Sequence, residues 1–233
     1  MRHIHTIALS LLAASAGMGL SSPAQAAGKA PVVVELFTSQ GCSSCPPANA
    51  NLITLSQRPD VLALSFAVTY WDRLGWKDTF GKPEFTQRQV TYEPALEQFG
   101  PYTPQMVVNG TTTAVGNHIA DVERLIDTAP ALTGPTIELA DSHVDIAAGT
   151  APTSGADVWL VRYDPQIHEV PIGRGENTGR TLPHTHVVYD LQNLGTWSGA
   201  PLALGLSAPA TGLKTAILVQ RPNGGPILSA TTN

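Results

Sequence analysis

A pair of cysteines directly after a short apolar run is the feature that most constrains this chain. Cys42 and Cys45 are its only cysteines, and a β-branched run at residues 31–37 precedes them. Two cysteines three positions apart, across a strand-to-helix turn, can bring their sulfur atoms within bonding distance. The spacing predicts a dithiol that cycles between thiol and disulfide.

The residues around the pair predict different roles for its two members. Two prolines follow Cys45, and they lack the N–H that an interior helical residue needs, so a helix should begin here with its N-cap near Ser43 or Ser44. The unpaired N–H groups and the dipole of a helix N-terminus favour a thiolate. We expect Cys42 to lie at the exposed mouth of the turn and attack, and the more sheltered Cys45 to resolve the mixed disulfide.

Two structural roles for the cysteine pair stay open beside the redox role. A structural disulfide would close a very short loop and so gain little from chain entropy. A structural zinc site normally needs four ligands, and the chain offers no second cysteine pair. We favour redox chemistry, which requires no metal and no organic cofactor.

The N-terminal segment has the features of a secretory signal peptide. A basic start is followed by an apolar stretch too short for a comfortable membrane span and by the small-residue pattern Ala24-Gln25-Ala26. We expect cleavage after Ala26, which removes residues 1–26; an uncleaved anchor is the alternative. The mature protein would be periplasmic or secreted, where an oxidising environment lets the cysteine pair rest as a disulfide.

The charge of the chain narrows the classes of partner. Its formal net charge is −5 at pH 7, and no block of basic residues occurs. This argues against nucleic acid and, once the signal peptide is cleaved, against membrane surfaces. We expect protein or small-molecule thiols and disulfides as partners, together with a redox partner protein.

The first part of the sequence predicts an α/β domain. Hydrophobic periodicity and turn signals indicate the order β-α-β-α-β-β-α. Pro94 should break or kink the second helix, and Asn109-Gly110 is a strong signal for a two-residue hairpin turn. The expected elements are strands 31–37, 61–69, 106–108 and 112–115, and helices 46–57, 83–99 and 119–128.

The second part predicts strands alone. From Gly134 onward, short apolar or alternating stretches are separated by Gly, Pro, Asn and Asp, which is typical of an antiparallel sandwich or barrel. One of these stretches covers Thr181–Asp190. We therefore expect an α/β domain of residues 27–132 followed by an all-β, antiparallel sandwich-like domain of residues 133–233.

Together these features resemble the thioredoxin fold over about residues 31–130. More narrowly, Glu35-Leu-Phe-Thr-Ser-Gln-Gly-Cys-Ser-Ser-Cys-Pro-Pro-Ala and Tyr102-Thr-Pro-Gln-Met-Val-Val-Asn-Gly look like the signatures of an uncharacterised bacterial family of secreted thioredoxin-like proteins. The resemblance implies a thioredoxin-like domain and thiol-disulfide oxidoreductase activity. It implies no particular substrate.

The resemblance also implies roles for residues outside the cysteine pair. In thioredoxin-like proteins a cis-proline packs beside the dithiol, and the residue before it binds extended substrates, which points to Pro104 and Thr103 here. Such proteins also carry a buried acid beneath the dithiol, six residues before the first cysteine. Glu35 lies seven before Cys42, and we expect it to accept the proton of Cys45 if the turn holds one extra residue.

A loop of aromatic and charged residues follows the second expected strand. It contains Trp71, Asp72, Arg73, Trp76, Lys77 and Asp78. This is the end of the sheet at which open α/β folds bind ligands. We expect Trp71 to contribute to substrate binding, and the alternative is that the loop only covers the core.

Histidines and a glycine-rich stretch in the second part suggest other functions. His184 and His186 would share one face of a strand, and with the dithiol they would suit copper, so a copper-binding metallochaperone is the rival hypothesis. A third hypothesis is a redox-inert protein-binding module. The glycine-rich stretch is either a functional loop or a polar contact between domains. Its polar residues are Arg174, Glu176, Asn177 and Arg180.

Overall fold

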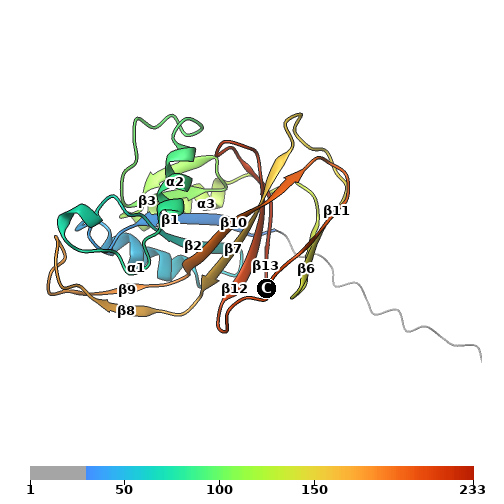
Figure 1. Ribbon diagram of the computed structural model, residues 1–233. Coiled ribbons are helices and arrows are strands. Elements are labelled where there is room, and N and C mark those ends of the chain that lie inside the picture. Colours follow the sequence, from blue (N-terminus) through green and yellow to red (C-terminus); the bar gives the residue numbers. More distant parts are fainter. Residues whose placement is uncertain (1–29) are drawn as a thin grey trace, which may run out of the picture.

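An eight-stranded mixed sheet forms the centre of the protein (Figure 1). The computed structural model describes residues 30–233, so the expected signal peptide at residues 1–26 lies outside the described residues. Within the described residues, three α-helices cover the two faces of one half of this sheet. None of the helices in this part of the chain is long and apolar enough to cross a membrane.

The first elements form the βαβ unit that the sequence predicts. β1 (Val32–Thr38) and β2 (Val61–Ala67) pair in parallel, and α1 (Pro46–Leu55) connects them. Side chains alternate between the two faces of a strand, so Val34 and Leu36 of β1 pack on α1. The chain therefore has a thioredoxin-like β-α-β start, and the cysteine pair lies where β1 leads into α1.

The next elements complete this half of the sheet. β3 (Gln105–Val108) runs antiparallel to β1 and pairs with β4 (Thr112–Val115). α3 (Ile119–Thr128) lies on the same face as α1, and α2 (Pro83–Tyr92) covers the opposite face. The sequence predicts a helix as far as residue 99, whereas α2 ends before Pro94, because a proline cannot continue the hydrogen-bonded ladder.

The turn between β3 and β4 shows why Asn109 and Gly110 are needed. Both residues have positive φ angles, 50° and 65°, which this two-residue hairpin turn requires. A Cβ atom at Gly110 would lie 2.7 Å from the carbonyl oxygen of Gly225, so close backbone packing also demands glycine there. The predicted hairpin is confirmed.

Strands from the second half of the chain continue the same sheet. β7 (Ala156–Asp164), β10 (Val187–Trp197), β12 (Lys214–Gln220) and β13 (Ile227–Thr232) extend it in the order β13-β12-β7-β10-β2-β1-β3-β4. The expected all-β half at residues 133–233 therefore shares a sheet with the first half, and the domain boundary at residues 132 and 133 stays a prediction. The physical reason is the edge of β2, whose unpaired backbone groups require a partner, and β10 supplies it as a parallel neighbour.

A smaller sheet gives the second half its sandwich-like packing. β5 (Ile137–Leu139), β6 (His143–Ile146) and β11 (Leu202–Gly205) form this three-stranded antiparallel sheet. Its apolar side chains pack with those of β7 and β12 and with the buried Trp197 of β10. Sandwich-like packing is thus present, but one of its two layers belongs to the eight-stranded sheet.

A two-stranded hairpin stands apart from both sheets. β8 (His168–Pro171) and β9 (Thr181–His184) pair with each other and with no other strand in residues 30–233. The hairpin lies beside α1 (Figure 1). The sequence predicts one strand over 181–190, whereas the chain turns after β9, and His186 has a φ of 50°. The prediction that His184 and His186 share one strand face is therefore wrong.

Candidate functional site

The two cysteines form a disulfide at the junction of β1 and α1. Their Cα atoms are 5.4 Å apart. Cys45 is the N-cap of α1, slightly later than the sequence predicts, and Pro46 and Pro47 begin the helix. The backbone N–H of Cys45 donates to the carbonyl oxygen of Cys42 over 3.2 Å, which closes the turn. The pair thus occupies the predicted position at a helix start.

A cis peptide bond lies beside the disulfide, in agreement with the thioredoxin resemblance. It joins Thr103 to Pro104. The sulfur of Cys42 lies 3.8 Å from the carbonyl oxygen of Thr103, and Pro104 is buried. The expected cis bond and its place beside the cysteines are confirmed. Substrate binding by these two residues stays a prediction.

Trp71 forms another side of the site. Its indole Nε1 donates to Oγ1 of Thr103 over 2.8 Å. A Cβ atom added to Gly41 would lie 3.2 Å from the Cβ of Trp71, so the position before Cys42 leaves little room for a side chain. Residues that are far apart in the sequence therefore meet around the disulfide.

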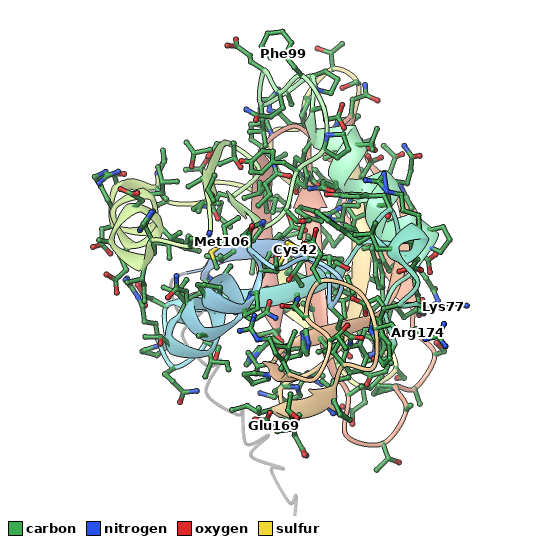
Figure 2. All side chains as sticks on the ribbon, turned by 90° about the vertical axis from the view of Figure 1, so that its left-hand side faces the viewer. Cys42, Lys77, Phe99, Met106, Glu169 and Arg174 are labelled. Atoms are coloured by element: carbon green, nitrogen blue, oxygen red, sulfur yellow. A yellow bond between two sulfur atoms is a disulfide. The ribbon has the colours of Figure 1, made fainter. Side chains whose placement is uncertain are left out.

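The disulfide itself is covered. Cys42 is 1% exposed and Cys45 is 0% exposed. The expected position of Cys42 at an exposed mouth is therefore wrong. The loop of residues 172–180, between β8 and β9, reaches over the cysteine turn. Figure 2 looks onto this face, with Cys42 near its centre and Arg174 of the loop to one side.

The loop holds the backbone of the cysteine turn through Asn177 and Glu176. The side-chain amide of Asn177, which is 0% exposed, donates to the carbonyl oxygens of Gln40 at 2.9 Å and Cys42 at 2.8 Å. The carboxylate of Glu176 accepts from the backbone N–H of Ser43 at 3.0 Å, and hydrogen bonding to Ser43 lowers the pKa of Glu176. The glycine-rich stretch is thus a structural part of the site.

Asp78 supports the same turn from the loop that follows β2. It is buried, and its carboxylate accepts from the backbone N–H groups of Gln40 at 2.7 Å and Phe80 at 2.9 Å. Burial raises the pKa of Asp78 to about 6, although these hydrogen bonds act in the opposite direction. Trp76 donates to the side chain of Gln40 at 2.9 Å. The sequence indicates an aromatic and charged loop here, but the burial of Asp78 leaves no signal in residue spacing.

Glu35 is buried as predicted, but it does not lie beneath Cys45. Its carboxylate accepts from Nε of Arg88 at 2.6 Å and from the hydroxyl of Tyr92, and both partners belong to α2, on the face of the sheet opposite α1. Arg88 also donates to Gln220 of β12 at 3.3 Å. Successive residues of a strand face opposite sides of the sheet. Glu35 lies seven residues before Cys42 instead of six, and this difference of one position turns the acid away from α1. The buried ion pair explains the acid, and the geometry gives no support to the expected proton transfer.

The histidines of the second half do not gather around the disulfide. His184 is buried, its Nδ1 lies 3.4 Å from the side-chain nitrogen of Asn49, and burial lowers its pKa to about 4. His168 lies 3.0 Å from a carboxylate oxygen of Asp164. Residues 30–233 contain no group of three or more His, Cys, Asp and Glu side chains arranged to hold a metal ion. The copper hypothesis therefore gains no histidine ligand beside the cysteines in this part of the chain.

Comparisons with known proteins identify relatives of this chain. A family model described as "Protein of unknown function (DUF1223)" matches residues 33–220. The crystal structure of protein AGR_C_4864 from Agrobacterium tumefaciens matches with 32% sequence identity and a TM-score of 0.71, over 88% of this chain and 95% of that chain. HBP35 of Porphyromonas gingivalis matches with 13% identity and a TM-score of 0.58, over 88% and 75%, and at that identity it shows likeness of fold alone. No curated protein matches.

Proposed function

Because the chain belongs to the DUF1223 family, whose description assigns no activity, we propose its function from the site itself: a thiol-disulfide oxidoreductase. The observation that carries the proposal is a disulfide at a helix N-terminus, with the Thr103–Pro104 segment beside the sulfur of Cys42. The N-terminal sequence supports action in the periplasm or outside the cell.

In the proposed reaction a partner dithiol is oxidised and the cysteine pair is reduced. A thiolate of the partner attacks the sulfur of Cys42, the Cys42–Cys45 bond breaks, and Cys45 leaves as a thiolate. The second thiolate of the partner then attacks the partner's own sulfur in the mixed disulfide and releases Cys42. Two electrons and two protons pass from the partner to the pair. In the reverse direction the thiolate of Cys42 attacks a partner disulfide, and Cys45 resolves the intermediate.

The surroundings of the two sulfurs support this division of roles. The sulfur of Cys42 lies beside the carbonyl oxygen of Thr103, whereas Cys45 is the N-cap of α1. No side chain caps the start of α1, so the positive end of the helix dipole is left for a thiolate of the pair. We propose that Thr103, Pro104 and Trp71 bind an extended segment of the partner next to Cys42.

Single-cysteine variants test the proposal. With only the resolving step removed, Cys45→Ser should trap partners as mixed disulfides through Cys42, whereas Cys42→Ser should trap none. Reduced and oxidised test proteins, glutathione and gels run without reductant provide the measurement. Trapping by Cys42→Ser instead would reverse the two roles. If neither variant traps a partner and the wild-type pair does not equilibrate with glutathione, the proposed activity is refuted.

The burial of the disulfide favours a second candidate, a redox-inert protein-binding module. A disulfide that no thiol can reach serves only to hold the turn. The reduction potential of the Cys42–Cys45 couple separates the two candidates, because a structural disulfide has a potential below about −300 mV and resists the glutathione pool. A potential in the range of known oxidoreductases supports the first candidate.

A further inference from the structure

The disulfide cannot react while it is covered. Exchange requires direct contact between an incoming sulfur and one sulfur of the disulfide. Cys42 and Cys45 are 1% and 0% exposed, so even a small thiol finds no path to them. Some part of the cover must therefore move before the proposed reaction begins.

The cover belongs to a hairpin that shares no backbone pairing with either sheet of the described residues. β8 and β9 pair only with each other among the described residues, and an isolated two-stranded hairpin is marginally stable. The loop between them is held together internally. The N–H of Ile172 donates to the carbonyl oxygen of Arg180, and the N–H of Gly179 donates to the carbonyl oxygen of Ile172, both over 2.8 Å. The side chain of Arg180 also donates to the side chain of Asn177 at 2.8 Å. These bonds make the loop one compact body.

Hydrogen bonds at the tip and side-chain packing at the base hold this body closed over the cysteine turn. At the tip, Asn177 makes two hydrogen bonds and Glu176 makes one, and all three go to backbone atoms of residues 40–43. Near the base, His184 meets Asn49 of α1 at 3.4 Å, and Phe80 packs on the rings of His168 and His184. Ile172 and Leu182 are buried there. The rim of the loop packs on Trp76, since a Cβ atom at Gly173 would lie 3.0 Å from its ring.

We propose that the loop 172–180, carried by the β8–β9 hairpin, is a lid that closes the redox site until a partner displaces Asn177 and Glu176. The inference rests on the proposed function. The lid occupies the carbonyl oxygens of Gln40 and Cys42 and the N–H of Ser43. These are acceptors and a donor of the peptide backbone, so the partner that fits them is an extended polypeptide, whose own N–H and C=O groups replace the amide and the carboxylate.

Lid variants test this with the full mature chain in its oxidised form. Asn177→Ala removes both tip hydrogen bonds, and the disulfide should then be reduced by dithiothreitol about tenfold faster than in the wild type, the factor expected for two lost hydrogen bonds. Glu176→Ala, at an exposed residue that can be changed without harm to folding, should give about a threefold increase. Alkylation of freed thiols and mass spectrometry measure the rates.

Glu169→Ala is the matched control. Glu169 is an exposed acid of β8 in the same hairpin and has no contact with residues 40–43 (Figure 2). Its variant should keep the wild-type rate. Equal rates for the wild type, Asn177→Ala and Glu176→Ala would overturn the lid. If Asn177→Ala does not fold, the comparison of Glu176→Ala with Glu169→Ala decides the question.

A second reductant separates the lid from the proposed function. Each oxidised variant is also mixed with a reduced protein dithiol, and the exchange rate is measured. If lid variants react faster with dithiothreitol but no variant exchanges with the protein dithiol, the lid stands and the oxidoreductase proposal fails. If the wild type exchanges as fast as the lid variants with both reductants, the oxidoreductase proposal stands and the lid fails.

Discussion

Asp78 offers a direct test of the electrostatics that hold the cysteine turn. Burial raises its pKa to about 6 from an ordinary value of 3.8. The folded protein therefore binds this proton more tightly than the unfolded chain does. The resulting stability is fully present below about pH 4 and is lost as the pH rises towards about 6. The difference between the two pKa values corresponds to about 3 kcal/mol, of which about 2–3 kcal/mol falls between pH 4 and pH 7.

Asp78→Asn isolates this contribution. Asparagine has nearly the same shape but does not titrate, and it loses one acceptor for the N–H groups of Gln40 and Phe80. That loss costs the same at every pH, so it cancels when the difference between variant and wild type is followed across pH. The free energy of unfolding of the variant, relative to wild type, should rise by about 2–3 kcal/mol from pH 4 to pH 7.

Urea denaturation of the oxidised protein, followed by tryptophan fluorescence at several pH values, provides the measurement. Asp141→Asn, which changes an exposed acid, controls for the loss of one negative charge. A difference in unfolding free energy between Asp78→Asn and wild type that stays constant across pH would refute the argument. A difference that falls as the pH rises would show that the hydrogen bonds to Asp78 outweigh its burial.

The ion pair beneath β1 gives two further predictions. Arg88→Met should lower the free energy of unfolding by about 3–5 kcal/mol, because it leaves the carboxylate of Glu35 buried without its cationic partner. A loss under about 1 kcal/mol, measured by urea denaturation, would contradict this prediction. Glu35→Gln should leave the ratio between formation and release of the mixed disulfide unchanged, since this carboxylate faces α2. Pre-steady-state kinetics that show slower release alone would return Glu35 to the role of proton acceptor for Cys45.

Local patterns account for what the sequence predicts well. The βαβ start, the Asn109-Gly110 hairpin and the helix at 119–128 follow from short-range periodicity and turn chemistry, and their observed bounds agree closely. The cis bond at Thr103–Pro104 follows from the thioredoxin resemblance, because the residues beside a dithiol are set by the order of elements. These features need no knowledge of distant segments.

The errors concern contacts between distant segments. Asn177 covers a turn that lies 135 positions earlier in the chain, and nothing in the spacing around Cys42 announces that contact. The union of the two halves depends on β10 pairing with β2 at Val187 and Ser65, which strand patterns do not specify. For Glu35, a single residue of register decides which face the acid occupies. Pairing and register are tertiary properties, so they appear only in the folded chain.

The buried network around Glu35 has a consequence for the independence of the two halves. Arg88 and Tyr92 come from the first half, and both share hydrogen bonds with Gln220, which belongs to the second. A fragment that ends before β12 would lose this amide and with it part of the hydrogen bonding that satisfies the ion pair. An exchange of halves between relatives therefore has to preserve an amide at position 220, because the second half supplies a hydrogen-bond partner to an ion pair that lies wholly in the first.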